Sequence, residues 1–315
     1  MQRPAMNPSL RLPRFAWAVL AFNLAVILWG AYVRATGSGA GCGGHWPLCN
    51  GEAIPRAPSV ATMIEYSHRV SSGLALLAVV ALAVATWRGR PKGDPARRGA
   101  LVAVALMVSE AALGAALVLF RLVAENESMA RAMFVGAHLF NTFLLLGALV
   151  LTAHWAAGGA RIGLAGRRRE AWSFAIALLG LLIVATSGAV AALGDTLHPA
   201  TTLTQALQQD LSPTSQLLLR LRVLHPLLAA ATAVFLLLLA VRIRRENRQP
   251  EVRNGARRVI LLVLLQIALG LANMGLLAPI GLQLGHLLLA DFVWLATILF
   301  GARVFALEVD RSPKS

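Results

Sequence analysis

Eight apolar runs divide this 315-residue chain, and they constrain its fold more than any other feature. The runs lie at 15–33, 65–87, 100–120, 132–154, 172–193, 220–241, 259–278 and 282–303. A bilayer core about 30 Å thick needs about 20 apolar residues in helical form. The runs are rich in Leu, Ala and Val and show no strict alternation of apolar and polar residues, so barrel strands are not expected. The sequence therefore predicts an all-α integral membrane protein with eight transmembrane helices.

The charges outside these runs predict the orientation. Hydrophobic residues make up 57% of the chain and charged residues only 14%, too few to cover a soluble globule. The net charge of +15 would suit nucleic acid, but 22 of the 29 basic residues lie in alternate segments, namely the two ends and the links 88–99, 155–171 and 242–258. The positive-inside rule then places both termini in the cytoplasm. We expect a protein of the bacterial cytoplasmic membrane, surrounded by lipid, with no nucleic-acid partner.

The two halves of the chain repeat each other. Three short segments recur in the same order at offsets of 157, 156 and 148 residues: Glu65–Arg69 with Arg222–Pro226, Glu110–Gly114 with Gln266–Gly270, and Gly136–Leu139 with Leu284–Leu287. Matches at one period indicate duplication of a structural unit. Four spans per unit give both copies the same orientation. The sequence predicts two tandem four-helix bundles, in an N-terminal half at 1–160 and a C-terminal half at 161–315.

One histidine stands near the outer end of each even-numbered span, at His68, His138, His225 and His286. A single histidine could simply bond a neighbouring helix carbonyl, but two pairs in repeat-matched positions favour a functional role. Zinc normally takes three or four protein ligands, and no third ligand recurs in both copies. Two imidazoles suit the axial positions of a haem iron inside a four-helix bundle. We therefore expect one haem site in each half.

Four arginines lie at the predicted outer face, at Arg34, Arg69, Arg220 and Arg222. Guanidinium groups bind carboxylates in forked geometry, so these side chains are candidates for contacts with haem propionates. The alternative is that they anchor the helices at the membrane surface.

The two copies differ one helical turn before the first histidine of each pair. Glu65 lies one helical turn before His68, whereas Arg222 stands at the equivalent place before His225. A carboxylate beside a bound group can accept or give a proton. We therefore expect chemistry in the N-terminal half and a permanent redox haem in the C-terminal half. The alternative for Glu65 is an ion pair with Arg69.

Two further acids, Glu110 and Asp291, lie within the spans. Glu110 matches Gln266 in the repeat. We interpret both acids as polar groups in helix packing rather than as catalysts.

The only cysteines, Cys42 and Cys49, share the first outward loop. The space outside the cytoplasmic membrane is oxidising, which favours a disulfide between them. A metal site of Cys42, His45 and Cys49 is a weaker alternative. The spacing does not decide whether a disulfide would be structural or redox-active.

These motifs together resemble the haem A synthase family over nearly the whole chain. The resemblance is carried by the four histidines and by three stretches, Arg34–Gly39, Cys42–Cys49 and Glu65–Arg69. It implies oxidation of a methyl group of haem O to the formyl group of haem A by successive hydroxylation, for the assembly of terminal oxidases. The loop departs modestly from the family pattern, because Gly43–His45 replaces a more polar insert.

The resemblance also implies roles for particular residues. His225 and His286 would ligate a haem b cofactor, and His68 and His138 would lie at the haem O site. Glu65 would act in catalysis, and the cysteines would form a disulfide. Expected partners are haem O synthase and a membrane electron acceptor, and a homo-oligomer is an open option.

Two other functions fit parts of the pattern. A membrane di-haem cytochrome b would use the same histidines to relay electrons and would leave haem unmodified. A thiol–disulfide oxidoreductase would depend on Cys42 and Cys49. A haem O prenyltransferase is disfavoured, because the sequence has no aspartate-rich motif for diphosphate and magnesium.

Overall fold

The computed structural model describes residues 8–211 and 217–307. Within these ranges the secondary structure is helical, without β-strands. Eight helices are long and apolar enough to cross a membrane. They are α1 (Pro8–Ala35), α2 (Val60–Gly89), α3 (Pro95–Leu119), α4 (Met129–Ala156), α5 (Arg168–Leu197), α7 (Leu217–Glu246), α8 (Pro250–Gly275) and α9 (Ile280–Val304). The predicted all-α membrane fold with eight spans is confirmed.

Polar capping residues begin three of these helices, α2, α3 and α4. The side chain of Ser59 accepts a hydrogen bond from the backbone N–H of Thr62 at the start of α2, and Ser128 does the same for Arg131 at the start of α4. Asp94 caps α3, with Pro95 in its first turn. Such caps satisfy the N–H groups that a helix start leaves unpaired. This is why α2 begins at residue 60 rather than at 65.

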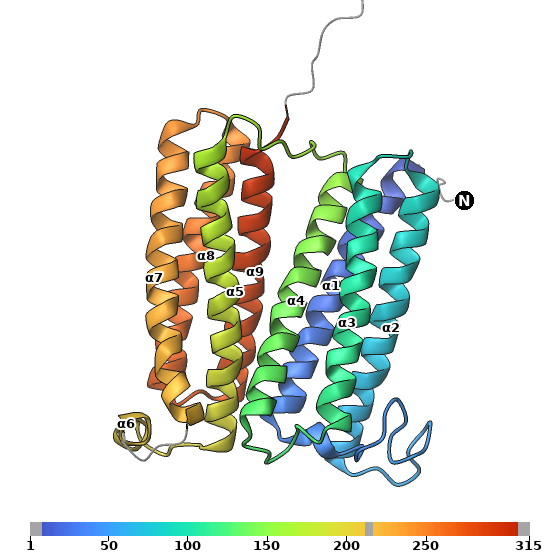
Figure 1. Ribbon diagram of the computed structural model, residues 1–315, viewed down its shortest axis with the longest axis vertical. Coiled ribbons are helices and arrows are strands. Elements are labelled where there is room, and N and C mark those ends of the chain that lie inside the picture. The colour runs from blue at the N-terminus through green and yellow to red at the C-terminus, as the bar shows by residue number, and fades with distance from the viewer. Residues whose placement is uncertain (1–7, 212–216, 308–315) are drawn as a thin grey trace, which may run out of the picture.

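The helices form two four-helix bundles that lie side by side (Figure 1). One bundle contains α1, α2, α3 and α4, and the other contains α5, α7, α8 and α9. Each bundle has its own core: Leu82, Leu146 and Leu149 are fully buried in the first, and Leu236 and Phe300 in the second. The arrangement agrees with the duplication seen in the sequence.

The two bundles meet along α4, α5, α1 and α9. Trp294 of α9 packs into the core of the first bundle and donates a hydrogen bond from Nε1 to the carbonyl of Phe143, at 2.6 Å. On the opposite, outward faces, leucines such as Leu77, Leu238 and Leu271 are more than 60% exposed. Apolar side chains so exposed face lipid in a membrane protein.

A shorter helix, α6 (Leu203–Leu211), lies in the link between α5 and α7, where the sequence has no apolar run. It begins with a variant of the capping box, because Thr202 Oγ1 accepts a hydrogen bond from Gln205 N at 3.1 Å and Gln205 Oε1 accepts one from Thr201 N, one residue earlier, at 2.9 Å. The Thr-x-x-Gln spacing is a helix start signal that does not depend on hydrophobicity.

Candidate functional site

The four predicted histidines lie at one end of the two bundles. His68 stands eight residues after the start of α2 and His138 nine residues after the start of α4. His225 stands eight residues into α7 and His286 six residues into α9. These four helices all begin at the same end of the molecule (Figure 1), so the rings lie roughly 9–14 Å from that end.

The histidine pair of the second bundle is close. The ring centres of His225 and His286 are 6.4 Å apart, and their planes are nearly perpendicular at 86°. Two imidazoles bonded at about 2 Å to opposite sides of one metal ion would have ring centres about 6 Å apart. The spacing and donor type of this pair therefore fit two axial ligands of a haem iron.

Each ring of this pair also has a polar neighbour on an adjacent helix. Ser187 Oγ of α5 lies 3.1 Å from His225 Nδ1. Gln266 Nε2 of α8 lies 3.2 Å from His286 Nε2, while the buried His286 Nδ1 has no hydrogen bond within the described ranges. Neighbours of this kind fix the orientation of a metal-ligating histidine.

In the first bundle, a carboxylate lies beside one of the two histidines. Glu110 Oε1 of α3 is 3.3 Å from His138 Nδ1. Asn141 donates a 2.6 Å hydrogen bond to Glu110 Oε2, and Thr142 donates a hydrogen bond to Glu110 Oε1. His68 of α2, the other histidine of this bundle, packs against Gly30 of α1. The carboxylate is thus held by α4 against the ring of the histidine that α4 carries.

We expected Glu110 to act only in helix packing, and the structure gives it a second contact. Glu110 does join α3 to α4, but it also contacts a candidate ligand, as Gln266 does for His286. The repeat contained the signal, because it pairs Glu110 with Gln266 and also His138 with His286. Asp291, the second intramembrane acid, is fully buried, and its carboxylate has no hydrogen-bond partner among residues 8–211 and 217–307.

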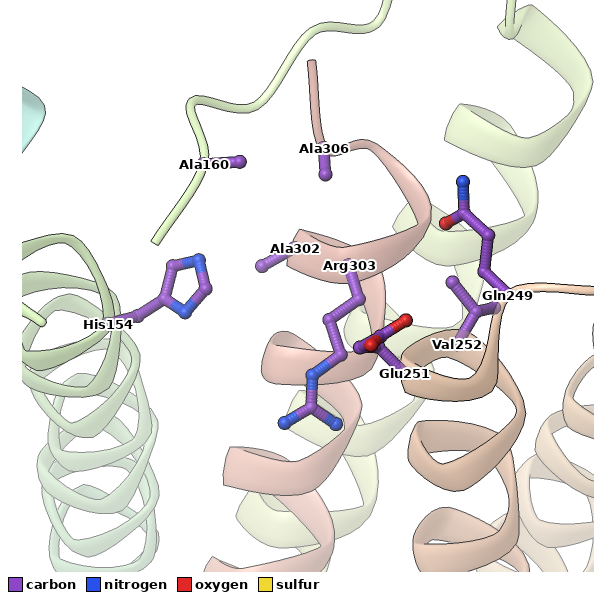
Figure 2. A pocket seen from close by; sticks show the side chains of 8 residues that line it. All are labelled: His154, Ala160, Gln249, Glu251, Val252, Ala302, Arg303 and Ala306. Atoms are coloured by element: carbon purple, nitrogen blue, oxygen red, sulfur yellow. The ribbon is translucent and has the colours of Figure 1, made fainter. Parts of the chain in front are cut away.

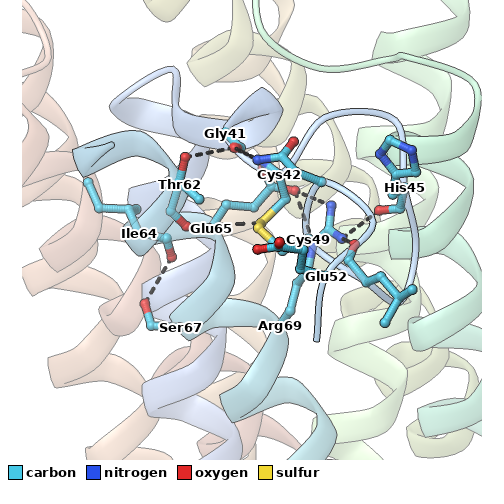
Figure 3. The surroundings of a disulfide bond; sticks show 12 residues. Gly41, Cys42, His45, Cys49, Glu52, Thr62, Ile64, Glu65, Ser67 and Arg69 are labelled. Atoms are coloured by element: carbon cyan, nitrogen blue, oxygen red, sulfur yellow. Dashed lines mark hydrogen bonds and ion pairs between the residues drawn. A yellow bond between two sulfur atoms is a disulfide. The ribbon is translucent and has the colours of Figure 1, made fainter. Parts of the chain in front are cut away.

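Glu65 is buried, with 4% exposure, and holds the outer loop to α2 (Figure 3). Its Oε2 accepts a hydrogen bond from Cys42 N at 2.8 Å, and its Oε1 pairs with Arg69 Nη2 at 2.5 Å. Arg69 Nη1 donates in turn to the carbonyls of His45 and Leu48, both at 2.6 Å. The ion pair considered as an alternative for Glu65 is therefore present, and it anchors the loop that contains the cysteines.

Cys42 and Cys49 form a disulfide, as predicted. Their sulfur atoms are bonded to each other, so the alternative metal site with His45 is wrong. Both residues are buried, at 0% and 1% exposure, which argues against exchange with thiol partners because exchange requires access to sulfur. The described part of the chain contains no cluster of three or more His, Cys, Asp or Glu residues that could hold a metal ion.

Three of the four candidate propionate-binding arginines, Arg34, Arg69 and Arg222, have protein partners. Arg34 of α1 donates to the carbonyl of Ala192 (2.6 Å), to Thr196 Oγ1 (2.7 Å) and to Gln283 Oε1 (2.9 Å), and so joins the first bundle to α5 and α9.

Arg222 of α7 pairs with Asp195 Oδ1 at 2.8 Å and with Asp210 Oδ1 at 2.5 Å, which ties α6 to the bundle. The side chain of Arg220 lies outside the described residues.

A pocket of about 210 Å³ lies at the opposite end of the molecule, between the bundles (Figure 2). His154 of α4, Glu251 of α8 and Arg303 of α9 line it. The four histidines described above do not contribute to this pocket.

Comparison with known proteins places the whole arrangement in a family. The COX15-CtaA family model, described as cytochrome oxidase assembly protein, matches residues 13–298. The chain belongs to the COX15-CtaA family. All the histidines, cysteines and acids discussed above fall within the matched range.

Several curated proteins resemble this COX15-CtaA member. A protein of Thermus thermophilus named protoheme IX farnesyltransferase is 48% identical over 295 residues, which cover 94% of this chain and 48% of the relative. The heme A synthase of Geobacillus kaustophilus is 29% identical over 265 residues, 81% of this chain and 80% of the relative. The heme A synthase of Alkalihalophilus pseudofirmus is 45% identical over 97 residues, 31% of this chain and 33% of the relative. The chain spans about half the length of the Thermus relative.

Proposed function

We propose that this protein is a haem A synthase that oxidises a methyl group of haem O to a formyl group in the bacterial cytoplasmic membrane. The observation that carries the proposal is the presence of two repeat-related histidine pairs, of which, among the described residues, only the first has a carboxylate in contact with a histidine, Glu110 at 3.3 Å from His138 Nδ1. Membership of the COX15-CtaA family and the heme A synthases among the relatives support it.

The second bundle would hold a haem b cofactor between His225 and His286. Their ring spacing of 6.4 Å supports this assignment. Haem b would supply an electron-transfer centre. In this bundle, the side chains within hydrogen-bond distance of the two rings are Ser187 and Gln266, which are neutral and suit a site that binds and orients without proton transfer.

The first bundle would bind the substrate haem O at His68 and His138. Glu110 would orient the His138 ring through its contact with Nδ1. Glu65 would accept a proton as a methyl C–H bond is replaced by C–O, because its carboxylate lies one turn from His68 on the same helix. Two such hydroxylations give a geminal diol, which becomes the formyl group by loss of water. Water would supply the oxygen of each hydroxyl group, so each hydroxylation would release two electrons to a membrane acceptor and two protons, of which Glu65 would take one.

The Arg69–Glu65 pair would hold the outer loop over this end of the first bundle. The loop is bonded to Glu65 through Cys42 N and to Arg69 through two carbonyls. Since the same carboxylate anchors the loop and accepts the proton, a fixed loop keeps Glu65 in place and restricts water at the site.

The name of the Thermus relative suggests a second activity, transfer of a farnesyl group to protohaem. That relative is about twice as long as this chain, so its named activity can reside in the part without a counterpart here. Within residues 8–211 and 217–307 there is no acidic cluster of the kind that would bind a magnesium diphosphate. We propose instead that a haem O synthase is a partner that supplies the substrate. The proposed haem O site lies toward the predicted outer face of the membrane.

Pigment extraction from the purified protein, followed by mass analysis, tests the proposal. Haem b together with haem O, haem A or a hydroxylated intermediate supports the synthase. Haem b alone favours an electron-relaying cytochrome b. Absence of haem rejects both functions, and farnesylation of protohaem by the purified chain would favour the transferase.

A further inference from the structure

Each of the four histidine rings lies against a glycine on the neighbouring helix of its own bundle. The glycines are Gly30 of α1 for His68, Gly114 of α3 for His138, Gly188 of α5 for His225, and Gly270 of α8 for His286. A methyl group placed on these glycines would lie 2.8 Å from His68 Cε1, 2.9 Å from His225 Cε1, 3.1 Å from His286 Cε1 and 3.7 Å from His138 Cε1. Three contacts are tighter than ordinary carbon–carbon contacts of about 3.5–4 Å, and one is ordinary.

The glycine positions are duplicated together with the histidines. Gly30 and Gly188 are 158 residues apart, and Gly114 and Gly270 are 156 residues apart, close to the offsets of the sequence repeat. Other helical glycines face other groups or none: a methyl group on Gly99 would lie 2.6 Å from Thr152 Oγ1, and one on Gly73 of α2 would meet nothing within 4 Å. Glycine is frequent in transmembrane helices, but here one stands opposite each of the four repeat-matched histidines.

We propose that Gly30, Gly188 and Gly270 are positioning residues that set the ring orientation of the histidines predicted to bind haem. This inference rests on the proposed function. When a histidine ring packs directly on helix backbone, the backbone restricts its movement on that side. The opposite face of the ring is then directed into the bundle. A methyl group at the glycine would displace the ring. Its nitrogen would then turn away from the position in which it would hold the haem iron, because the packed helix yields less than the side-chain torsions.

His138 is held differently from the other three. Its glycine, Gly114, leaves ordinary contact distance, and Glu110 contacts its Nδ1 instead. The second bundle therefore has two tightly packed rings, whereas the first has one tight ring and one with more room. This difference suits a permanent cofactor in the second bundle and an exchanging substrate in the first.

Matched alanine substitutions in the full-length protein test this inference. Gly188→Ala should alter the electron paramagnetic resonance g-values of the low-spin ferric haem b and weaken haem b retention by roughly tenfold. Gly73→Ala, on an open helix surface, should leave both unchanged. In the first bundle, Gly30→Ala should weaken binding of added haem O, whereas Gly114→Ala should retain wild-type binding. Wild-type g-values and haem b content in Gly188→Ala would overturn the inference.

A second variant covers the case in which Gly188→Ala does not fold. The double variant Gly188→Ala, His225→Gly lacks the ring that the methyl group would meet, and free imidazole can then occupy the space in a shifted position. The double variant should fold and regain a haem b spectrum with imidazole. If it does not, the defect does not arise from contact with the ring and the inference is wrong. Absence of haem b from the wild-type protein, or its retention in His225→Ala, would instead overturn the proposed function.

Discussion

At the scale of single residues, the two bundles differ most in the groups that touch their histidines. Glu110 contacts His138 in the first bundle, and Gln266 contacts His286 in the second. A carboxylate can orient the imidazole and increase its electron donation to a bound metal, whereas an amide can only orient it. The contrast between Glu110 and Gln266 thus adds a second chemical difference between the sites to that between Glu65 and Arg222.

Replacement of this carboxylate by an amide tests the difference. Glu110→Gln copies the second bundle into the first, so the fold and the haem b spectrum should be retained. Conversion of haem O should fall by roughly 10–100-fold, the usual effect of losing a residue that orients a metal ligand. Turnover of haem O by purified protein, with haem b content as the internal control, measures both. Wild-type turnover would show that Glu110 acts in packing alone.

The Glu65–Arg69 pair gives a second residue-scale prediction. Its side chains are only 5% and 11% exposed, so Arg69→Met would leave a buried carboxylate without its cation and the loop carbonyls without donors. Loss of one partner of a buried pair costs about 3–5 kcal/mol in the free energy of unfolding. Denaturant unfolding followed by intrinsic fluorescence in detergent checks this.

The chain provides a matched control for that measurement. Arg56 and Glu52 form a pair with the same i, i+4 spacing in the loop before α2, but their side chains are 91% and 42% exposed. Arg56→Met should change stability by less than about 1 kcal/mol. Equal effects of the two substitutions would contradict the account of Arg69 as the anchor of the loop.

At the scale of helices, hydrophobicity predicted the eight spans but not the short helix α6. The spans are long apolar runs, whose fold in lipid is dictated by the need to pair every backbone group. By contrast, α6 depends on a capping box at Thr202 and on the ion pair between Asp210 and Arg222. The ion pair joins two different helices, so the hydropathy of the sequence does not predict it.

The capping box itself can be tested. Thr202→Ala removes the acceptor for Gln205 N and should destabilise α6 by about 1 kcal/mol, because a lost cap leaves an unpaired N–H group. Hydrogen exchange should become faster within residues 203–211 and remain unchanged in α5. Unchanged exchange within α6 would show that its tertiary contacts hold it without the cap.

The candidate site was also predictable only in part. The repeat identified the four histidines. Glu65 stood out as an acid that the second copy lacks, and the cysteines stood out as the only two in the chain. The sequence did not reveal that Arg34 joins α1 to α5 and α9, since those contacts depend on how the bundles pack. Nor did it single out Gly30 and Gly188, because a glycine in a transmembrane helix becomes informative only when the side chain opposite it is known.

At the scale of the whole molecule, the orientation in the membrane remains a prediction from charge. The basic links between α2 and α3, α4 and α5, and α7 and α8 lie at the end of the bundles opposite the histidines (Figure 1). The positive-inside rule places this end in the cytoplasm. Single cysteines introduced at Lys92 and at Glu125, in a chain with Cys42→Ser and Cys49→Ser, should react oppositely with a membrane-impermeant thiol reagent in intact cells. Labelling at residue 125 and not at residue 92 is expected, and the reverse pattern would invert the predicted topology.

The central claim is that the two bundles divide the work: the first modifies haem O, and the second holds haem b. Conversion of haem O by the Glu65→Ala variant, recorded together with its reduced-minus-oxidised haem b spectrum, tests this claim most directly. The account predicts an unchanged haem b spectrum and no formation of haem A. Loss of the haem b spectrum in this variant, or continued formation of haem A, would contradict the division.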